Sequence, residues 1–387
     1  MKNIKKLKNI IVSIAIIVSS PFIASVVLKI VPNISVTANR IANTTIGSHE
    51  DLDDDTILQD SLQDPVILDD WSENILSNGL GWDYSDTTQD ADNFDFFDKK
   101  FDATAGSQPY PNVDTLTNHS GSIVQTVFNN YSGSPYISLD GGGMVKNCTT
   151  ISDTTLLSES RQSVQFNIEV NSNEPQVLIM HTHTTESFEP YERTYYDNSF
   201  GYRTTDSSKN VVMIGDAITK ELNDAGINTI HSTTIHDYPS YTGSYDRSAT
   251  TVKELLRQYP SIKVVLDIHR DALSRDGDLL QPIVEVDGKK SAQIMIVSGC
   301  DDGTMNMPNY LQNFRFATLI QKYLYSDYGD LARPILFDYR HYNQDLTTGS
   351  LLVEVGTHGN TLEQVRYAGH LFGKSLAKAL LSISYNT

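Results

Sequence analysis

Cysteine and tryptophan are scarce in this 387-residue chain, with two of each, and basic residues are outnumbered by acidic ones. The two cysteines, Cys148 and Cys300, are too few for the disulfide framework of a small secreted domain and too far apart for a zinc-binding cysteine motif. The sequence does not decide whether Cys148 and Cys300 form a single disulfide. The 29 Lys and Arg against 48 Asp and Glu give a formal net charge of −19. Because such a chain repels phosphate backbones, we expect no nucleic-acid partner.

The acidic side chains concentrate in one segment. Between Glu50 and Asp102 there are 17 of them against two lysines, a local balance of −15. Like charges keep a polar chain extended, so residues 32–120 are predicted to form an acidic, flexible stalk. Apolar groups at 66–68 and 94–97 interrupt this background, which leaves open that the segment docks on a partner.

Four lysines precede a largely apolar stretch at 10–30 near the N-terminus. Its length is close to the roughly 20 residues that a helix needs to cross a bilayer, and the positive flank should stay in the cytoplasm. We therefore expect an N-terminal membrane anchor within residues 1–31 and an extracytoplasmic remainder. A cleaved signal peptide stays open, because Pro21 and several serines weaken a permanent helix.

Residues 121–387 have the composition of one globular domain. Strand-like and helix-like patterns alternate along it, which predicts an α/β fold with a mainly parallel twisted sheet flanked by helices. The expected strands lie at 165–170, 177–180, 264–268 and 294–297, and the expected helices at 210–225, 248–259, 309–325 and 361–381.

Three apolar runs in this domain carry polar side chains of matching chemistry. The run at 177–180 is followed by His181, His183 and Glu186; the run at 264–268 ends on His269; and the run at 351–355 contains Glu354. In open α/β sheets the carboxyl ends of parallel strands meet at one edge, where these side chains would gather. Two imidazoles and a carboxylate are a ligand set for catalytic Zn²⁺, and a further glutamate supplies a general base.

Each of these residues could instead have a purely structural role. A histidine at a strand end is often only a hydrogen-bonded structural residue, and Glu354 could pair with Arg270. His181 and His183 differ by one strand pleat, so the sequence does not decide between them.

The residues named above lie in three short sequence blocks at 181–188, 267–271 and 352–361. A fourth block lies at 245–248. Together they resemble the stage II sporulation protein P family, which is related to the zinc-dependent N-acetylmuramoyl-L-alanine amidases. The resemblance covers roughly residues 165 to 385, and it implies an amidase-like catalytic domain at 121–387.

This resemblance implies an extracytoplasmic peptidoglycan hydrolase at the sporulation septum and engulfing membrane, acting in engulfment during endospore formation. Such proteins cut the amide between the lactyl group of muramic acid and L-alanine of the stem peptide, and endopeptidase activity is also associated with them. The implied cofactor is zinc, and the implied partners are peptidoglycan and the stage II sporulation proteins D and M. A non-catalytic cell-wall scaffold and a zinc peptidase with another substrate stay open.

The resemblance also assigns roles to residues. His183 and His269 align with imidazole ligands, with His181 as a rival to His183, and Glu354 aligns with the catalytic glutamate. The chain departs from the amidase pattern at the carboxylate ligand. Glu186 is the natural replacement there, and Asp206, His231 and His236 are further candidates. Arg270 would orient a substrate carboxylate or stabilise an oxyanion, or else form a structural salt bridge.

Overall fold

The computed structural model describes residues 107–385. The predicted anchor at 1–31 and most of the predicted stalk at 32–120 lie outside the described residues. Within 107–385, none of the helices combines the length and the apolar character that a membrane crossing requires.

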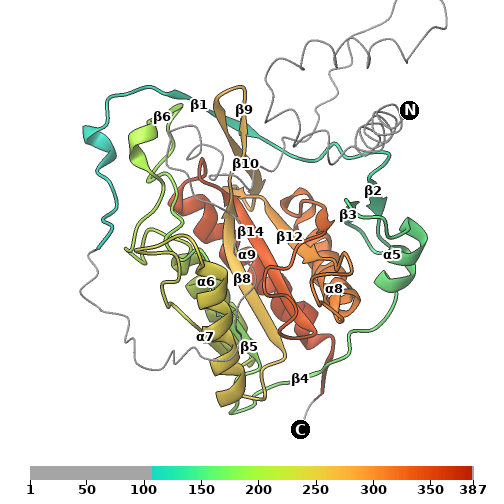
Figure 1. Cartoon of the computed structure of the whole chain (residues 1–387). Coiled ribbons are helices and arrows are strands. Elements are labelled where there is room, and N and C mark those ends of the chain that lie inside the picture. The colour runs from blue at the N-terminus through green and yellow to red at the C-terminus, as the bar shows by residue number, and fades with distance from the viewer. Residues whose placement is uncertain (1–106, 386–387) are drawn as a thin grey trace, which may run out of the picture. The chain divides into compact units, whose positions relative to one another are not determined.

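The centre of the described region is an eight-stranded sheet (Figure 1). Five of its seven neighbouring pairs are parallel, which confirms the predicted α/β fold with a mainly parallel sheet. In spatial order the strands are β2 (Tyr136–Ser138), β3 (Met144–Asn147), β13 (Ile335–Asp338), β12 (Ile294–Gly299), β14 (Gly349–Thr357), β8 (Val264–Asp271), β5 (Val177–Met180) and β7 (Thr229–His231).

Apart from β2, which is antiparallel to its neighbour β3, the sheet consists of two parallel groups of opposite direction. β12 pairs with β13 in parallel but with β14 antiparallel, so the direction changes between β12 and β14. On one side of that point, β14, β8, β5 and β7 all run the same way. Their carboxyl ends therefore share one edge of the sheet, which is the edge that the sequence predicts for the site.

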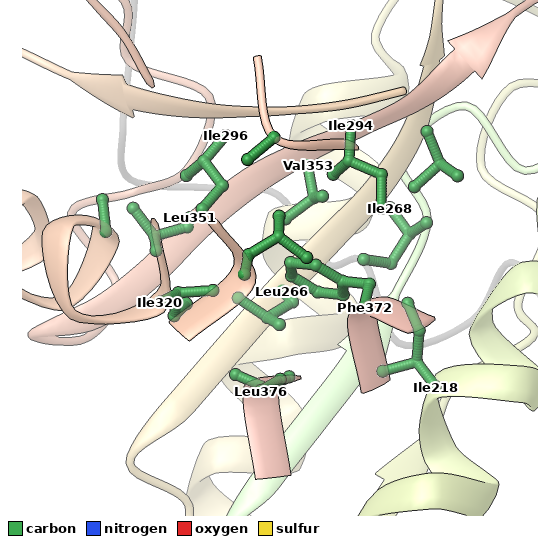
Figure 2. Close-up of a cluster of buried hydrophobic side chains, with 14 of the residues drawn as sticks. Ile218, Leu266, Ile268, Ile294, Ile296, Ile320, Leu351, Val353, Phe372 and Leu376 are labelled. Atoms are coloured by element: carbon green, nitrogen blue, oxygen red, sulfur yellow. The ribbon is translucent and has the colours of Figure 1, made fainter. Parts of the chain in front are cut away.

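Helices cover both faces of this sheet. Ile214 and Ile218 of α6 (Val212–Asp224) belong to the largest core cluster, together with side chains of α8 (Tyr310–Tyr328) and α9 (Leu362–Leu381). Figure 2 shows this core, where Phe372 and Leu376 of α9 pack with strand side chains. On the other face, Val252 of α7 (Ser244–Gln258) packs against alternate residues of β5.

The helix predictions at 210–225, 309–325 and 361–381 are confirmed within a few residues. α9 begins where expected because Thr361 and Gln364 form a capping box. α7 begins at Ser244, four residues earlier than predicted, after Gly243 with φ 79°.

The predicted strand at 165–170 is mostly wrong. Only β4 (Ile168–Glu169) forms there, and it pairs with β15 (Ser384–Tyr385) in a separate two-stranded sheet. The disulfide that was left open between Cys148 and Cys300 does not form.

A second sheet was not predicted. It consists of β11 (Lys289–Ala292), β10 (Asp278–Val286), β1 (Gly121–Thr126) and β6 (Tyr195–Tyr196), with β9 (Ser274–Arg275) paired to β10 (Figure 1). A small hydrophobic core beside this sheet includes Val113 and Phe200.

Within the described end of the predicted stalk, Tyr110 donates a 2.7 Å hydrogen bond to the carbonyl oxygen of Phe188. Residues 110–113 thus pack against the domain, just before β1. The short elements are η3 (Val113–Thr115), α5 (Asp153–Ser160), η4 (Asn198–Phe200) and η5 (Gly329–Leu331).

Candidate active site

The three strands predicted to deliver the site lie side by side. Met180 of β5 is opposite Asp267 of β8, and Glu354 of β14 is opposite His269 of β8. Every residue of β8 is buried, because the sheet is covered on both faces. The carboxyl ends of these strands therefore place buried polar side chains close together.

Three of the predicted residues form a cluster at this edge, which we call the histidine–glutamate cluster (His183, Glu186 and His269). The imidazole rings of His183 and His269 are 5.2 Å apart between centroids and nearly perpendicular. Nδ1 of His269 lies 3.7 Å from Oε2 of Glu186. None of the three residues is more than 8% exposed. The cluster thus brings two imidazoles and one carboxylate into a buried space.

The Glu186 carboxylate is held from two sides. The backbone N–H of Arg270 donates to Oε2 at 3.1 Å, and the Arg203 guanidinium lies 3.8 Å from Oε1. The backbone N–H of Glu186 also donates to the carbonyl of His183, which fixes the turn between the two residues. Glu186 therefore reaches His269 because the chain turns back immediately after β5.

The two imidazoles of the cluster have opposite charge preferences. Burial, followed by the positive charges of His269 and Arg203, holds the pKa of His183 well below its usual range. For His269, burial acts in the same direction, but the carboxylates of Asp267, Glu186 and Glu354 outweigh it and raise the pKa to about 10. His183 is therefore neutral at pH 7, whereas His269 carries a proton next to three carboxylates.

His181 belongs to a different environment. Its Nδ1 lies 2.9 Å from the carbonyl oxygen of Ile268, and its Nε2 lies 2.8 Å from Nε2 of His231. Burial lowers the pKa of His181 to about 3, so it is neutral. Because Nδ1 must carry the proton that the carbonyl accepts, the one lone pair of the neutral ring is on Nε2, which faces His231 and not the histidine–glutamate cluster.

The other candidates for the third ligand also have partners elsewhere. Nδ1 of His236 lies 2.7 Å from the carbonyl of His181, and its Nε2 lies 2.9 Å from Oγ1 of Thr251. The Asp206 carboxylate accepts hydrogen bonds from its neighbour Ser208. Of the carboxylates considered, Glu186 is the one that contacts His269.

Glu354 lies beside the cluster, in register with His269. Its negative charge is among those that raise the pKa of His269. The register of β14 shifts between Glu354 and Thr357, and Gly356 has φ 66° within that irregularity. A Cβ on Gly356 would lie 2.8 Å from Oδ1 of Asn360, so only glycine fits. The irregularity interrupts the pairing of β14 with β8 directly after Glu354, and the pairing resumes at Thr357 with Asp271.

The side chain of Arg270 is occupied by backbone carbonyls. Its Nε donates to Ser187 at 2.9 Å and one terminal nitrogen donates to Tyr202 at 3.2 Å. Arg270 is only 4% exposed. These contacts favour a positioning role, in which Arg270 holds the loop after Glu186 and presents its own backbone N–H to that carboxylate.

Sequence reasoning missed two neighbours of the cluster. Asp267 lies 2.8 Å from Nε2 of His269, and its place two residues before His269 on a strand was the available signal. The Tyr241 ring stacks on His183 at 4.6 Å, with its hydroxyl 3.2 Å from Nε2, although Tyr241 is 49% exposed. No pattern in the sequence points to Tyr241, because it comes from a loop.

The three side chains of the histidine–glutamate cluster lie near one another, but their nitrogen and oxygen atoms are not arranged around a common point. Across residues 107–385, no group of three or more His, Cys, Asp or Glu side chains has the arrangement of a ready metal site. The chemistry of the set still fits zinc, since it offers two imidazoles and a carboxylate in a buried space.

Solved structures of several amidases resemble part of this chain. The N-acetylmuramoyl-L-alanine amidase AmiC2 of Nostoc punctiforme matches 54% of this chain and 96% of its own, with 12% identity and a TM-score of 0.32. The CwlD amidase of Clostridioides difficile, solved in complex with the GerS lipoprotein, matches 54% and 99%, with 11% identity and a TM-score of 0.31. TM-scores this low do not support a conclusion about fold or activity.

Sequence comparison is more informative. Stage II sporulation protein P of Bacillus subtilis (strain 168) is 29% identical over 205 residues, which are 50% of this chain and 48% of that protein. The match thus spans about half the length of this relative. The family model of stage II sporulation protein P matches residues 142–377, which include the histidine–glutamate cluster and Glu354. The resemblance seen in the four blocks is thereby confirmed, and the chain belongs to the stage II sporulation protein P family.

Proposed function

We propose that this chain is a zinc-dependent peptidoglycan hydrolase, an N-acetylmuramoyl-L-alanine amidase. The observation that carries the proposal is the meeting of His183, Glu186 and His269 in a buried space beside Glu354. These residues come from separate strands and loops. A scaffold protein has no need to bury two imidazoles and the Glu186 carboxylate together beside the half-buried Glu354, because burying charged groups is unfavourable and such clusters are typical of functional sites.

His183, Glu186 and His269 would hold the zinc ion. His183 is neutral and therefore offers a lone pair, whereas His269 must release a proton before it can bind metal. Zinc in such a site acidifies a bound water to a pKa of about 7 and so supplies a nucleophile for amide hydrolysis.

The remaining steps belong to the protein. Glu354 accepts a proton from the attacking water and passes it to the leaving amine nitrogen. Arg270 keeps Glu186 in place through its backbone N–H, and the Tyr241 ring covers the face of His183. Amide cleavage releases the L-alanine amino group of the stem peptide and leaves the lactyl carboxylate on muramic acid.

The setting of this activity is also part of the proposal. Family membership supports a role in engulfment during endospore formation, with the stage II sporulation proteins D and M as partners and an additional endopeptidase activity. The anchor at 1–31 and an acidic stalk that ends before residue 110 would place the catalytic domain, and with it the site, on the outer face of the membrane. The sequence pattern supports this arrangement.

Zinc content and cell-wall cleavage test the proposal together. We expect the purified full-length chain to contain one zinc per molecule and to release stem peptides from purified peptidoglycan, and a chelator should abolish the release. Zinc-free protein that binds peptidoglycan without cutting it would contradict the proposal in favour of a scaffold. Zinc-loaded protein that cleaves only other peptides would contradict the substrate.

A further inference from the structure

We infer that Asp267 is a positioning residue that holds Nε2 of His269, so that Nδ1 is the nitrogen presented to Glu186 and to a bound metal. The metal part of this inference rests on the proposed function, whereas the contact with Asp267 does not. Neither the four sequence blocks nor the predicted ligand set gave Asp267 a role.

The contact follows from strand geometry. Asp267 and His269 are two residues apart on β8, so their side chains point to the same side of the sheet. Oδ1 of Asp267 lies 2.8 Å from Nε2 of His269. On the opposite side of the ring, Nδ1 faces Oε2 of Glu186 at 3.7 Å. The imidazole therefore has one nitrogen in ion-pair contact with Asp267 of its own strand, without a well-directed hydrogen bond, and the other nitrogen directed at the cluster.

Asp267 is itself fixed by Thr182. The backbone N–H of Thr182 donates to Oδ1 of Asp267 at 2.7 Å, and the Thr182 hydroxyl donates to Oδ2 at 2.7 Å. Both residues are buried, Thr182 completely. Since each carboxylate oxygen has a donor, Asp267 cannot rotate away from His269 without leaving two buried donors unpaired, which is unfavourable.

The network continues beyond Thr182. Its hydroxyl lies 2.7 Å from Oγ of Ser248 on α7, and the Asn343 side-chain amide donates to the same Ser248 oxygen at 3.0 Å. Tyr342 and Asn343 both have left-handed backbones, with φ 41° and 55°. For a tyrosine this conformation is strained and persists only where the surroundings hold it.

Four chain segments are thus linked through Asp267 to one imidazole: the loop after β13, the start of α7, the turn after β5 and β8 itself. This explains Ser248 and Thr182, two members of the sequence blocks that have no part in the proposed chemistry. Outer partners of this kind orient a ligating imidazole, and their removal typically lowers metal affinity by about 10–100-fold.

Asp267→Asn is the variant that tests the inference, and Asp271→Asn is its matched control. Asp271 lies on the same strand and is equally buried, but its carboxylate pairs with Arg333 at 2.9 Å. We expect the zinc affinity of the full-length chain, measured by chelator competition, to fall about 10–100-fold in Asp267→Asn and to stay unchanged in Asp271→Asn. Unchanged affinity in Asp267→Asn, or equal losses in both variants, would overturn the inference.

Nuclear magnetic resonance of ¹⁵N-labelled histidine gives a readout that a purely structural role would not move. We expect the Nε2 proton of His269 to be strongly deshielded and slow to exchange in the wild type and in Asp271→Asn, and to lose both properties in Asp267→Asn. Persistence of that signal in Asp267→Asn would overturn the inference. A wild-type chain that binds no zinc would refute the proposed function, while this signal still decides the role of Asp267. Should Asp267→Asn fail to fold, Ser248→Ala loosens the same network from α7 and is measured in the same way.

Discussion

The surroundings of His181 and His183 differ far more than their separation of two residues suggests. Both imidazoles are buried, and burial lowers the pKa of both. Around His181 the neighbours are a backbone carbonyl and another histidine, and both ring nitrogens are used. Around His183 they are His269 and the hydroxyls of Tyr241 and Ser244, which a ligand could replace. Burial alone therefore does not distinguish a structural histidine from a functional one, whereas the identity of its partners does.

The chain path explains the difference. β5 ends at Met180, and the chain turns over 182–185. On a continued strand, His181 and His183 would point the same way and would be neighbours on one face. The turn instead directs His181 toward α6 and His183 toward α7. The largest expected effect that follows from this contrast concerns Glu354, which lies in the His183 region.

Glu354→Gln should reduce stem-peptide release by about 10²–10⁴-fold, because glutamine keeps the shape of the side chain and removes the basic oxygen. Zinc should remain bound, since Glu354 is proposed as the base and not as a ligand. The paired measurement is zinc stoichiometry together with release from purified peptidoglycan.

Glu189→Gln is the control for Glu354→Gln. Glu189 is a buried glutamate of the same domain, and its carboxylate pairs with Arg193 and accepts a hydrogen bond from Tyr202. Loss of zinc along with activity in Glu354→Gln would make Glu354 a ligand, and full activity would remove it from the mechanism.

Replacing the two histidines one at a time tests the contrast directly. His183→Ala should weaken zinc binding by at least about 100-fold, more than the loss of an outer partner does. His181→Ala should keep zinc binding nearly intact and lower the free energy of unfolding, because it leaves His231 and the Ile268 carbonyl without their partner. Chelator competition and chemical denaturation measure the two quantities. If His181→Ala loses zinc and His183→Ala retains it, the two assignments must be exchanged.

Much of the fold was predictable because its patterns are local. The all-apolar run of β5 and the helices α6 and α9 were visible in the sequence, as was the placement of His269 and Glu354 on two separate strands. The choice between His181 and His183 was not, since it depends on where β5 stops. Tyr241 was invisible for a similar reason: it lies in a loop and reaches His183 through the tertiary fold.

Gly215 tests the His181 side of the contrast. A Cβ built on this α6 residue would lie 2.3 Å from Nε2 of His231 and 2.8 Å from Nε2 of His181. A helical Gly→Ala change normally stabilises by up to about 1 kcal/mol. Here we expect Gly215→Ala to destabilise by about 1–3 kcal/mol through overpacking. Chemical denaturation measures this change.

A double-mutant cycle provides the control for Gly215→Ala. Removing the nearer ring with His231→Ala should make the alanine at 215 far less harmful, so the two changes should not be additive. Additive effects would show that the clash is relieved elsewhere in α6 and that the histidine pair does not set the identity of residue 215.

The smallest effect concerns a third buried histidine, His358, which contrasts with His269. Burial, followed by the positive charge of Arg270, lowers the pKa of His358 to about 3, whereas carboxylates raise that of His269. In the unfolded chain an imidazole titrates near 6.5. Below that pH the unfolded state therefore binds a proton that folded His358 rejects, and stability falls as the pH decreases toward 3.

His358→Gln should remove this contribution. Between pH 6.5 and 5.5 the wild type should lose roughly 1 kcal/mol more of its unfolding free energy than the variant does. Denaturation at both pH values measures the difference, and His119→Gln, which removes an exposed imidazole, is the control. A His358→Gln variant with the same pH dependence as the wild type would mean that His358 takes up its proton in the folded state. The proposed contrast, in which carboxylates raise the pKa of buried His269 and Arg270 lowers that of buried His358, would then not hold.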